Sequence, residues 1–166
     1  PSVMVDTLIL HHYRGKRIPK LFLNTVTPKG APPVTENRVL RIAMNGITGR
    51  MGYRQHLVRS ILPIREQGGI TLADGSKLTV EPILVGRNEA KLKELAALHN
   101  VEHYTTDLDA MINDPSVDIV FDASMTSLRY DTLSKSIAAG KHVFTEKPTA
   151  ETLSEAVALA RQAKDQ

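Results

Sequence analysis

Apolar residues are spaced in two alternating ways along the chain from residue 39 onward. Short runs with few polar interruptions, such as VLRIAMN (39–45) and EPILVG (81–86), are typical of strands buried on both faces. Between such runs, apolar residues recur every three or four positions, as on one face of a helix. The alternation predicts a doubly wound α/β sheet, in which helices connect parallel strands.

The pattern predicts five strand–helix units with one inserted hairpin. The strands are expected at 39–45, 81–86, 102–106, 117–124 and 141–146, and the helices at 49–65, 88–99, 107–113, 127–140 and 149–164. Asp74-Gly75 predicts a hairpin turn within 69–80. Asp107 and Thr149 are expected to cap helix starts, and Gly140 to end a helix. The expected apolar helix faces are Met51, Val58, Ile61 and Leu62 in the first helix, and Leu92, Leu95, Ala96 and Leu98 in the second.

Residues 1–38 differ from the rest of the chain. They hold two short apolar runs followed by TPKGAPPVTEN, which is typical of a linker. Six basic and two acidic residues give this segment +4, so the remainder lies near −1 within the net charge of +3. We interpret 1–38 as a leader and linker of unassigned role, and 39–166 as one domain.

Composition excludes several function classes. The chain has no cysteine, and therefore neither disulfides nor thiolate chemistry, which fits a cytoplasmic protein. No run of about 18 apolar residues predicts a membrane span. Aromatic residues make up 4% and Trp is absent, which is poor material for stacking on nucleic acid. No metal site is expected, since His11 and His12 are adjacent and lack an obvious third ligand.

The first predicted strand runs directly into MNGITGRMG. Glycines between a strand and a helix allow a tight turn, a close approach to pyrophosphate and close helix packing. The N–H groups and dipole at the helix start favour an anion. The glycines follow a GxxGxxG spacing instead of the commoner GxGxxG, and a plain turn is the alternative. The residues predicted to bind phosphate are Gly46, Thr48, Gly49, Arg50 and Met51.

The end of the 81–86 strand bears on cofactor type. An Asp or Glu at this place holds the ribose 2′-hydroxyl of NAD. The chain has Gly86, Arg87 and Asn88 instead, and an arginine suits the 2′-phosphate of NADP by charge and by its planar fork. We expect NADP, with NAD as the alternative cofactor and a solvated arginine as the alternative role for Arg87.

Two further strand ends complete the predicted site. Ala123, Ser124 and Met125 are small or flexible, as required where a cofactor crosses a strand end, whereas Asp122 is expected to bond a neighbouring turn or cap a helix. The last strand runs into Glu146, Lys147 and Pro148 at the same sheet edge. Lys147 would face the nicotinamide as the catalytic residue, and its X-Pro bond can be cis. A surface Lys147 paired with Glu146 is the alternative.

RIAMNGITGRMG and AAGKHVFTEKP, with the order of elements between them, resemble the Gfo/Idh/MocA oxidoreductases. The resemblance covers about Arg41 to Lys164. It implies an NAD(P)-binding Rossmann domain followed by an α+β substrate domain, and interconversion of a sugar, inositol or similar polyol with its ketone. It also implies that Lys147 contacts nicotinamide and substrate and helps proton transfer.

The chain departs from the family pattern in two places. Many members read ATPNxxH where this chain reads Ala123-Ser124-Met125-Thr126, with Arg129 and Tyr130 in place of the usual His, so the substrate class stays open. The chain ends before a substrate domain, so it is expected to be the cofactor half of an enzyme, inactive alone, with a homo-oligomer possible at full length. GRMG also resembles dihydrodipicolinate reductases, whose His-His and Lys-rich signature is not found here. A non-catalytic NAD(P)-binding or sensor module is the other hypothesis.

Overall fold

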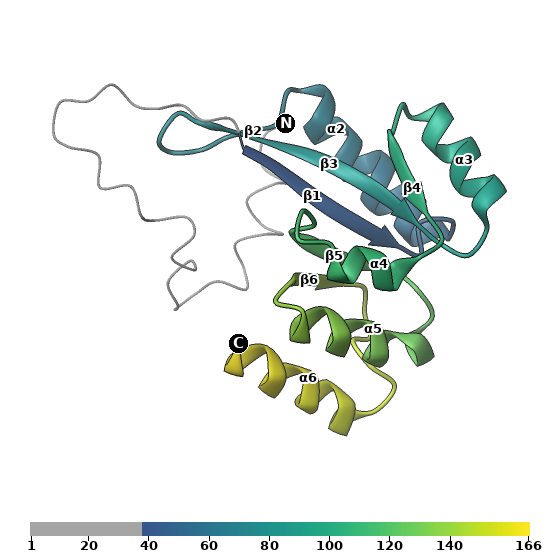
Figure 1. Cartoon of the computed structure of the whole chain (residues 1–166), viewed down its shortest axis with the longest axis vertical. Coiled ribbons are helices and arrows are strands. Elements are labelled where there is room, and N and C mark those ends of the chain that lie inside the picture. The colour runs from purple at the N-terminus through teal and green to yellow at the C-terminus, as the bar shows by residue number, and fades with distance from the viewer. Residues whose placement is uncertain (1–37) are drawn as a thin grey trace, which may run out of the picture. The chain divides into compact units, whose positions relative to one another are not determined.

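The computed structural model describes residues 38–166, so the predicted leader lies outside the described residues except for Arg38. The described strands are β1 (Arg38–Asn45), β2 (Ile70–Thr71), β3 (Lys77–Val85), β4 (His103–Thr105), β5 (Ile119–Asp122) and β6 (His142–Thr145), as Figure 1 shows. The helices are η2 (Met51–Ile61), which continues as α2 (Leu62–Glu66), α3 (Glu89–Leu98), α4 (Leu108–Asn113), α5 (Thr126–Ala138) and α6 (Leu153–Asp165). None of these helices is long and apolar enough to cross a membrane.

All six strands form one sheet with β1 near its middle. β1 pairs in parallel with β3 on one side and with β5 on the other, and β5 continues to β6. The outer edge of β3 pairs with β4 in parallel and with the short β2 in antiparallel. The chain therefore moves outward from β1 to β4, returns across the sheet to β5 and moves outward again, which confirms the predicted doubly wound α/β fold.

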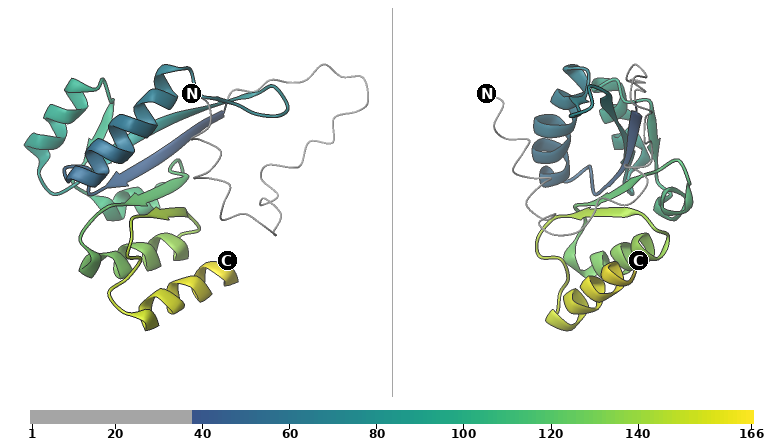
Figure 2. Two further views of the ribbon diagram at one scale, coloured as in Figure 1. Left: turned by 180° about the vertical axis from the view of Figure 1, so that it is seen from behind. Right: turned by 90° about the vertical axis from the view of Figure 1, so that its left-hand side faces the viewer.

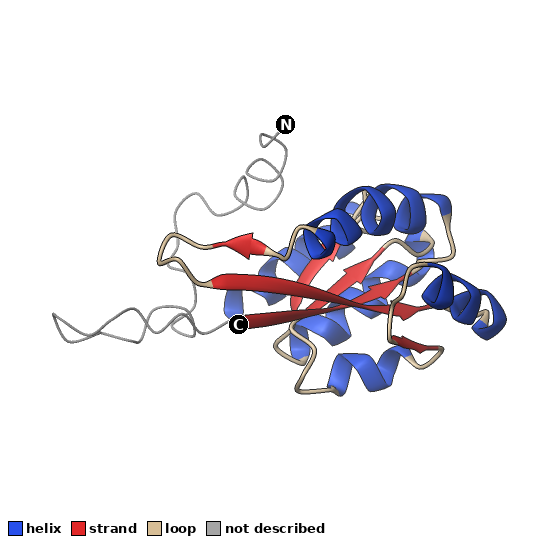
Figure 3. Cartoon of the chain, turned by 90° about the horizontal axis from the view of Figure 1, so that it is seen from above, coloured by secondary structure: helices blue, strands red, loops and turns tan. Residues whose placement is uncertain are grey.

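Helices cover both faces of the sheet (Figures 2 and 3). On one face, η2, α2 and α3 bury Leu57, Leu62 and Leu92 against strand residues such as Met44 and Leu84. Alternate strand residues point the other way, toward α4, and α6 packs on α5 through a separate apolar cluster. Burial of each such large side chain stabilises the fold by about 1.5–3 kcal/mol.

The predicted hairpin is present, but its second arm is not a separate element. Asp74 Oδ1 accepts hydrogen bonds from the N–H and hydroxyl of Ser76, which holds the turn. From Lys77 the chain runs unbroken through Pro82 to Val85, so the arm and the second core strand are one strand. Pro82 falls between the positions that pair with β2 and those that pair with β4. The outer edge of β3 therefore has no ladder hydrogen bond there for a proline to remove.

The predicted apolar faces were wrong at two residues. Met51 is exposed, and the buried residues of the first helix are Gly52, Leu57 and then Leu62, spaced by five. Hydrogen bonds in η2 close i→i+5 rings, so the assumed period of 3.6 residues does not hold there. Leu98 is 66% exposed because it lies off the 92, 95, 96 stripe of α3.

Helix ends were predicted correctly in two of three cases. Asp107 caps α4, since its Oδ1 accepts from the N–H of Ala110, and Gly140 follows α5 with φ of +72°. Thr149 was wrong as the cap of the last helix. Thr152 caps α6 in a capping box with Glu155, whereas Thr149 has no acidic residue three positions later.

Candidate functional site

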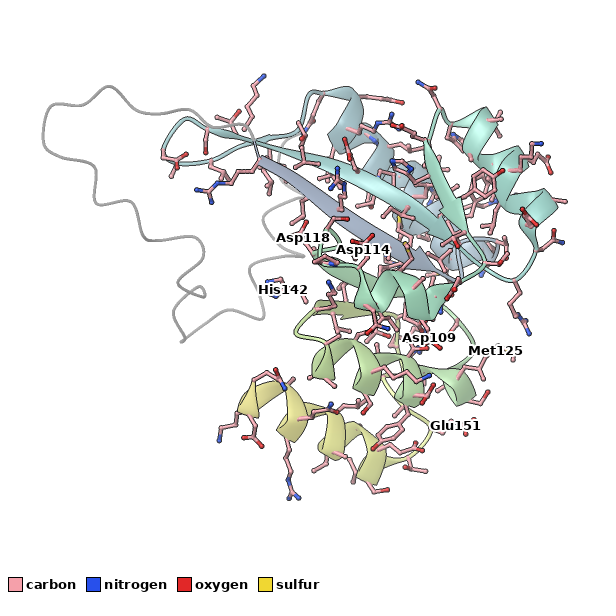
Figure 4. All side chains as sticks on the ribbon, viewed as in Figure 1. Asp109, Asp114, Asp118, Met125, His142 and Glu151 are labelled. Atoms are coloured by element: carbon pink, nitrogen blue, oxygen red, sulfur yellow. The ribbon has the colours of Figure 1, made fainter. Side chains whose placement is uncertain are left out.

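The carboxyl ends of four parallel strands lie in register at one edge of the sheet. Asn45 of β1 lies opposite Val85 of β3 and Asp122 of β5, and Asp122 lies opposite Thr145 of β6. The next residues along each strand begin the four predicted site segments. The fold therefore brings these segments to a single edge, in the order Arg87, Gly46, Ala123 and Lys147. In Figure 4, Met125 labels this end of the domain, and Asp118 and His142 label the opposite end.

Gly46 brings the first turn against the end of β5. Its φ is +78°, and a Cβ at this residue would lie 2.6 Å from the carbonyl carbon of Ala123 and 2.7 Å from the nitrogen of Ser124. A Cβ on Gly52 would lie 2.7 Å from the carbonyl oxygen of Gly46. Both positions therefore require glycine, as predicted for a tight turn followed by a closely packed helix.

The start of η2 has the chemistry that an anion requires. The first turn of the helix contains no acidic residue, and the adjoining Gly49 and Arg50 are exposed. The opening N–H groups of a helix lack acceptors within the helix and carry its positive dipole end. The residues present therefore fit a phosphate group. Met51 is exposed at the same helix start.

The end of β3 presents a cation without a neighbouring carboxylate partner. Arg87 is exposed and forms no ion pair within residues 38–166. Gly86 lies next to the glycine turn, since a Cβ there would be 3.6 Å from the Thr48 methyl carbon. Asn88 caps α3, because its Oδ1 accepts from the N–H of Lys91 at 3.0 Å. This arrangement fits a ligand phosphate at Arg87.

The end of β6 leaves Lys147 exposed beside a partly buried Glu146. The Lys147–Pro148 peptide bond is cis. The carboxylate of Glu146 bonds His56 Nε2 at 2.5 Å and accepts from the backbone N–H of Lys147 at 3.3 Å. The His56 hydrogen bond lowers the pKa of Glu146 below its usual 4.5. The alternative role for Lys147 was an ion pair with Glu146. No such salt bridge is present within residues 38–166.

The buried carboxylate of Asp122 links the end of β1 to the turn after β5. Asp122 is fully buried, and its oxygens accept hydrogen bonds from Asn45 Nδ2 at 2.7 Å and from the N–H and hydroxyl of Ser124. It therefore bonds the neighbouring turn, as expected. It also pairs with Arg129 at 3.1 Å, a contact that the sequence did not predict.

Three residues at this edge were missed by sequence reasoning. Arg129 was noticed only as a replacement for a family histidine, while Asn45 and His56 were assigned no role. Asn45 is the last residue of the first strand, directly before the glycine turn, which is a position that could have drawn attention. The pattern carried no signal for His56, whose partner Glu146 is 90 residues away.

Residues 40–166 match the family model GFO_IDH_MocA, an oxidoreductase family with an NAD-binding Rossmann fold. The chain belongs to this family. This result favours the Gfo/Idh/MocA oxidoreductases over the dihydrodipicolinate reductases, the other family that GRMG resembles.

Relatives of this Rossmann domain include two named dehydrogenases. The chain is 68% identical to D-xylose dehydrogenase of Paenarthrobacter nicotinovorans over 131 residues, which are 79% of this chain and 34% of the relative. It is 30% identical to scyllo-inositol 2-dehydrogenase (NAD(+)) of Bacillus subtilis strain 168, over 76% of this chain and 33% of the relative. The structure of levoglucosan dehydrogenase with NADH and levoglucosan matches with a TM-score of 0.62 and 26% identity, over 77% of this chain and 33% of that one. The chain thus spans about a third of the relatives it matches.

Proposed function

We propose that this chain is the cofactor-binding part of an oxidoreductase that transfers a hydride between NADP and a sugar, inositol or similar polyol. The order of side chains along the carboxyl edge of the sheet carries the proposal. Arg87 follows β3, the glycine turn follows β1, and Lys147 follows β6. Arg87 and Lys147 follow β3 and β6, which are three strand spacings of about 4.8 Å apart, or about 14 Å in total. A ligand that contacts both must be elongated and must carry its anionic group near the middle, as a dinucleotide does.

Each segment has a distinct task in this proposal. The backbone at Gly46, Thr48, Gly49, Arg50 and Met51 binds the pyrophosphate, and Gly86, Arg87 and Asn88 hold the adenosine ribose and its 2′-phosphate. Ala123, Ser124 and Met125 line the middle of the edge, while Glu146, Lys147 and Pro148 line the nicotinamide end. The cofactor supplies the hydride chemistry when bound. In reduction of a ketone the Lys147 ammonium donates a proton to the reacting oxygen of the substrate, and in oxidation of an alcohol the neutral Lys147 amine accepts that proton.

The substrate class rests on relatives. Two of them are named for D-xylose and scyllo-inositol, and a third was solved with levoglucosan. These compounds share secondary alcohols on a ring, which is the group that a hydride-accepting nicotinamide oxidises. The identity of 68% makes D-xylose the first substrate to test. Since the chain covers about a third of these relatives, contacts to the substrate beyond Lys147 are assigned to the part that the chain does not cover.

Two measurements test the proposal. Calorimetric titration of the chain with NADPH and with NADH is expected to show binding of both, with NADPH tighter. The complete gene product is expected to reduce NADP in the presence of D-xylose or scyllo-inositol. Absence of binding to either dinucleotide would refute the proposed cofactor site. Binding without turnover on any sugar or polyol would instead support the alternative, a non-catalytic NAD(P)-binding module.

A further inference from the structure

The guanidinium of Arg129 connects two loops at the Lys147 end of the site. Its Nη2 donates to the carbonyl of Ser124 at 2.6 Å, in the turn after β5. Its Nη1 donates to the carbonyl of Glu146 at 2.9 Å and to that of Pro148, in the loop after β6. The bonded carbonyls of the second loop therefore lie immediately before and after Lys147.

The charge of the same guanidinium is neutralised by the buried carboxylate of Asp122. Nε of Arg129 donates to Asp122 Oδ2 at 3.1 Å, and the two side chains are 4% and 0% exposed. Asp122 is itself held by Asn45 at the end of β1 and by Ser124. All buried side-chain polar atoms among residues 38–166 have a partner. Arg129 thus ties the backbone of the two loops to a fully bonded carboxylate inside the sheet, and the fork geometry of its donors allows all these bonds at once.

This connection bears on Lys147 because its ammonium forms no salt bridge within residues 38–166. Lys147 is exposed, and only its backbone N–H contacts Glu146. The backbone on either side, where Arg129 binds, therefore determines where the flexible side chain of Lys147 starts and which way it leaves the loop. The three carbonyl contacts satisfy the remaining donors of the buried guanidinium. Because these carbonyls belong to the loops after β5 and β6, the same contacts hold the two loops.

We propose that Arg129 is a positioning residue, which fixes the loops after β5 and β6 so that Lys147 and Ser124 frame the nicotinamide end of the cofactor. This inference rests on the proposed function. It assigns to Arg129 an effect on one end of the dinucleotide: the nicotinamide end depends on it, whereas the adenosine end at Arg87 and the glycine turn do not.

The test compares two probes on the complete gene product that carries this chain. One probe is NADPH, and the other is 2′-phospho-ADP-ribose, which is NADPH without its nicotinamide. The ratio of their Kd values measures what the nicotinamide end adds. Arg129→Lys keeps the charge beside Asp122 but loses the planar fork. We expect it to raise the Kd for NADPH about tenfold, the scale of one lost hydrogen bond to a charged group, with the Kd for the fragment within about twofold of wild type. With saturating NADP, kcat is expected to fall more than KM for the polyol rises.

Lys141→Met is the matched control. Lys141 Nζ also binds two loop carbonyls, those of Asp114 and Val117, but at the amino ends of β5 and β6. It is expected to lower the melting temperature without changing the Kd ratio. If Arg129→Lys does not fold, the double variant Asp122→Asn with Arg129→Gln removes the buried charges together and should show the same selective loss.

Three results would overturn the inference. One is an Arg129→Lys protein with an unchanged Kd ratio, which would make the residue a counter-ion for Asp122 only. Another is an equal loss of affinity for both probes, which would indicate general loosening of the domain. The third is a wild-type ratio near one, because the nicotinamide end would then not be held by these loops. Failure of the wild type to bind either probe would refute the proposed function itself and is distinguishable from all three.

Discussion

His56 and Glu146 join the first helix to the loop that carries Lys147. Nε2 of His56 lies 2.5 Å from Oε1 of Glu146, and both side chains are largely buried, at 18% and 16% exposure. The imidazole also packs on Phe121 and Phe144, with ring centroids 4.6 and 5.7 Å away. The aromatic contacts fix the imidazole, and the imidazole in turn orients the carboxylate beside Lys147.

The His56 contact predicts a pH-dependent contribution to stability. Because the pKa of Glu146 is lowered in the folded state, mainly by this hydrogen bond, its stabilising effect is present above the usual pKa of 4.5 and is lost as the pH falls through the lower folded value. His56→Leu should therefore be less stable than wild type at pH 6, and the difference should shrink below about pH 4.5. Urea unfolding of both proteins from pH 6 to pH 3 measures this.

His99→Leu is the control for this prediction. His99 Nε2 is 2.9 Å from the hydroxyl of Tyr53, a partner that is not a carboxylate. Its replacement should lower the free energy of unfolding, but the difference from wild type should not shrink comparably below about pH 4.5. A gap between wild type and His56→Leu that stays constant down to pH 3 would contradict the assigned role of Glu146.

Arg87 is predicted to set the preference for NADP. Arg87→Ala should weaken NADPH binding by roughly 10- to 10³-fold, because one or two charge-assisted hydrogen bonds to the 2′-phosphate are lost. NADH binding should stay nearly unchanged, and the wild-type preference should weaken at high salt because Arg87 is exposed. Paired titrations with NADPH and NADH measure the preference, with exposed Arg161 of α6 mutated to Ala as a control. Equal or tighter NADH binding by wild type would point to Asn88 as a ribose ligand.

Lys147 is predicted to contribute far more to catalysis than to cofactor affinity. In the complete gene product, Lys147→Ala should lower kcat by roughly 10²- to 10⁴-fold, the usual contribution of a general acid–base group. The Kd for NADPH should change far less, because the predicted phosphate contacts lie at the glycine turn. Steady-state kinetics with D-xylose, with Lys164→Ala of α6 as the control, checks this. A kcat within a few-fold of wild type would make Lys147 an ordinary surface residue.

Gly46 is predicted to be required for both stability and binding, whereas Gly75 affects stability alone. Both have positive φ, +78° and +84°, but a Cβ on Gly75 meets nothing within 4 Å. Gly75→Ala should cost about 1–2 kcal/mol of backbone strain. Gly46→Ala should cost about 1–3 kcal/mol more, because its Cβ overlaps the backbone at Ala123. Urea unfolding and NADPH titration of the two variants separate the effects. Similar losses in both would contradict the close approach.

The sequence by itself determined the architecture and the place of the site. Apolar runs, helix spacings and the Gly46 turn depend on neighbours close in the chain, so the doubly wound α/β sheet and the four segments at one edge of it could be predicted. The caps at Asp107 and Gly140 were readable for the same reason. Thr152 could also have been predicted as the cap of α6, since its capping box with Glu155 is a local pattern, whereas the predicted cap, Thr149, lies outside the helix.

Only the tertiary structure decided how the site is held together. The pairs His56–Glu146 and Asn45–Asp122 join residues 90 and 77 positions apart, and no local pattern specifies such partners. In the sequence, Arg129 looks like an ordinary surface residue of an amphipathic helix. It is buried because a buried carboxylate and three loop carbonyls surround its guanidinium. Burial of a charge depends on this complete set of partners, which exists only after the strands are paired.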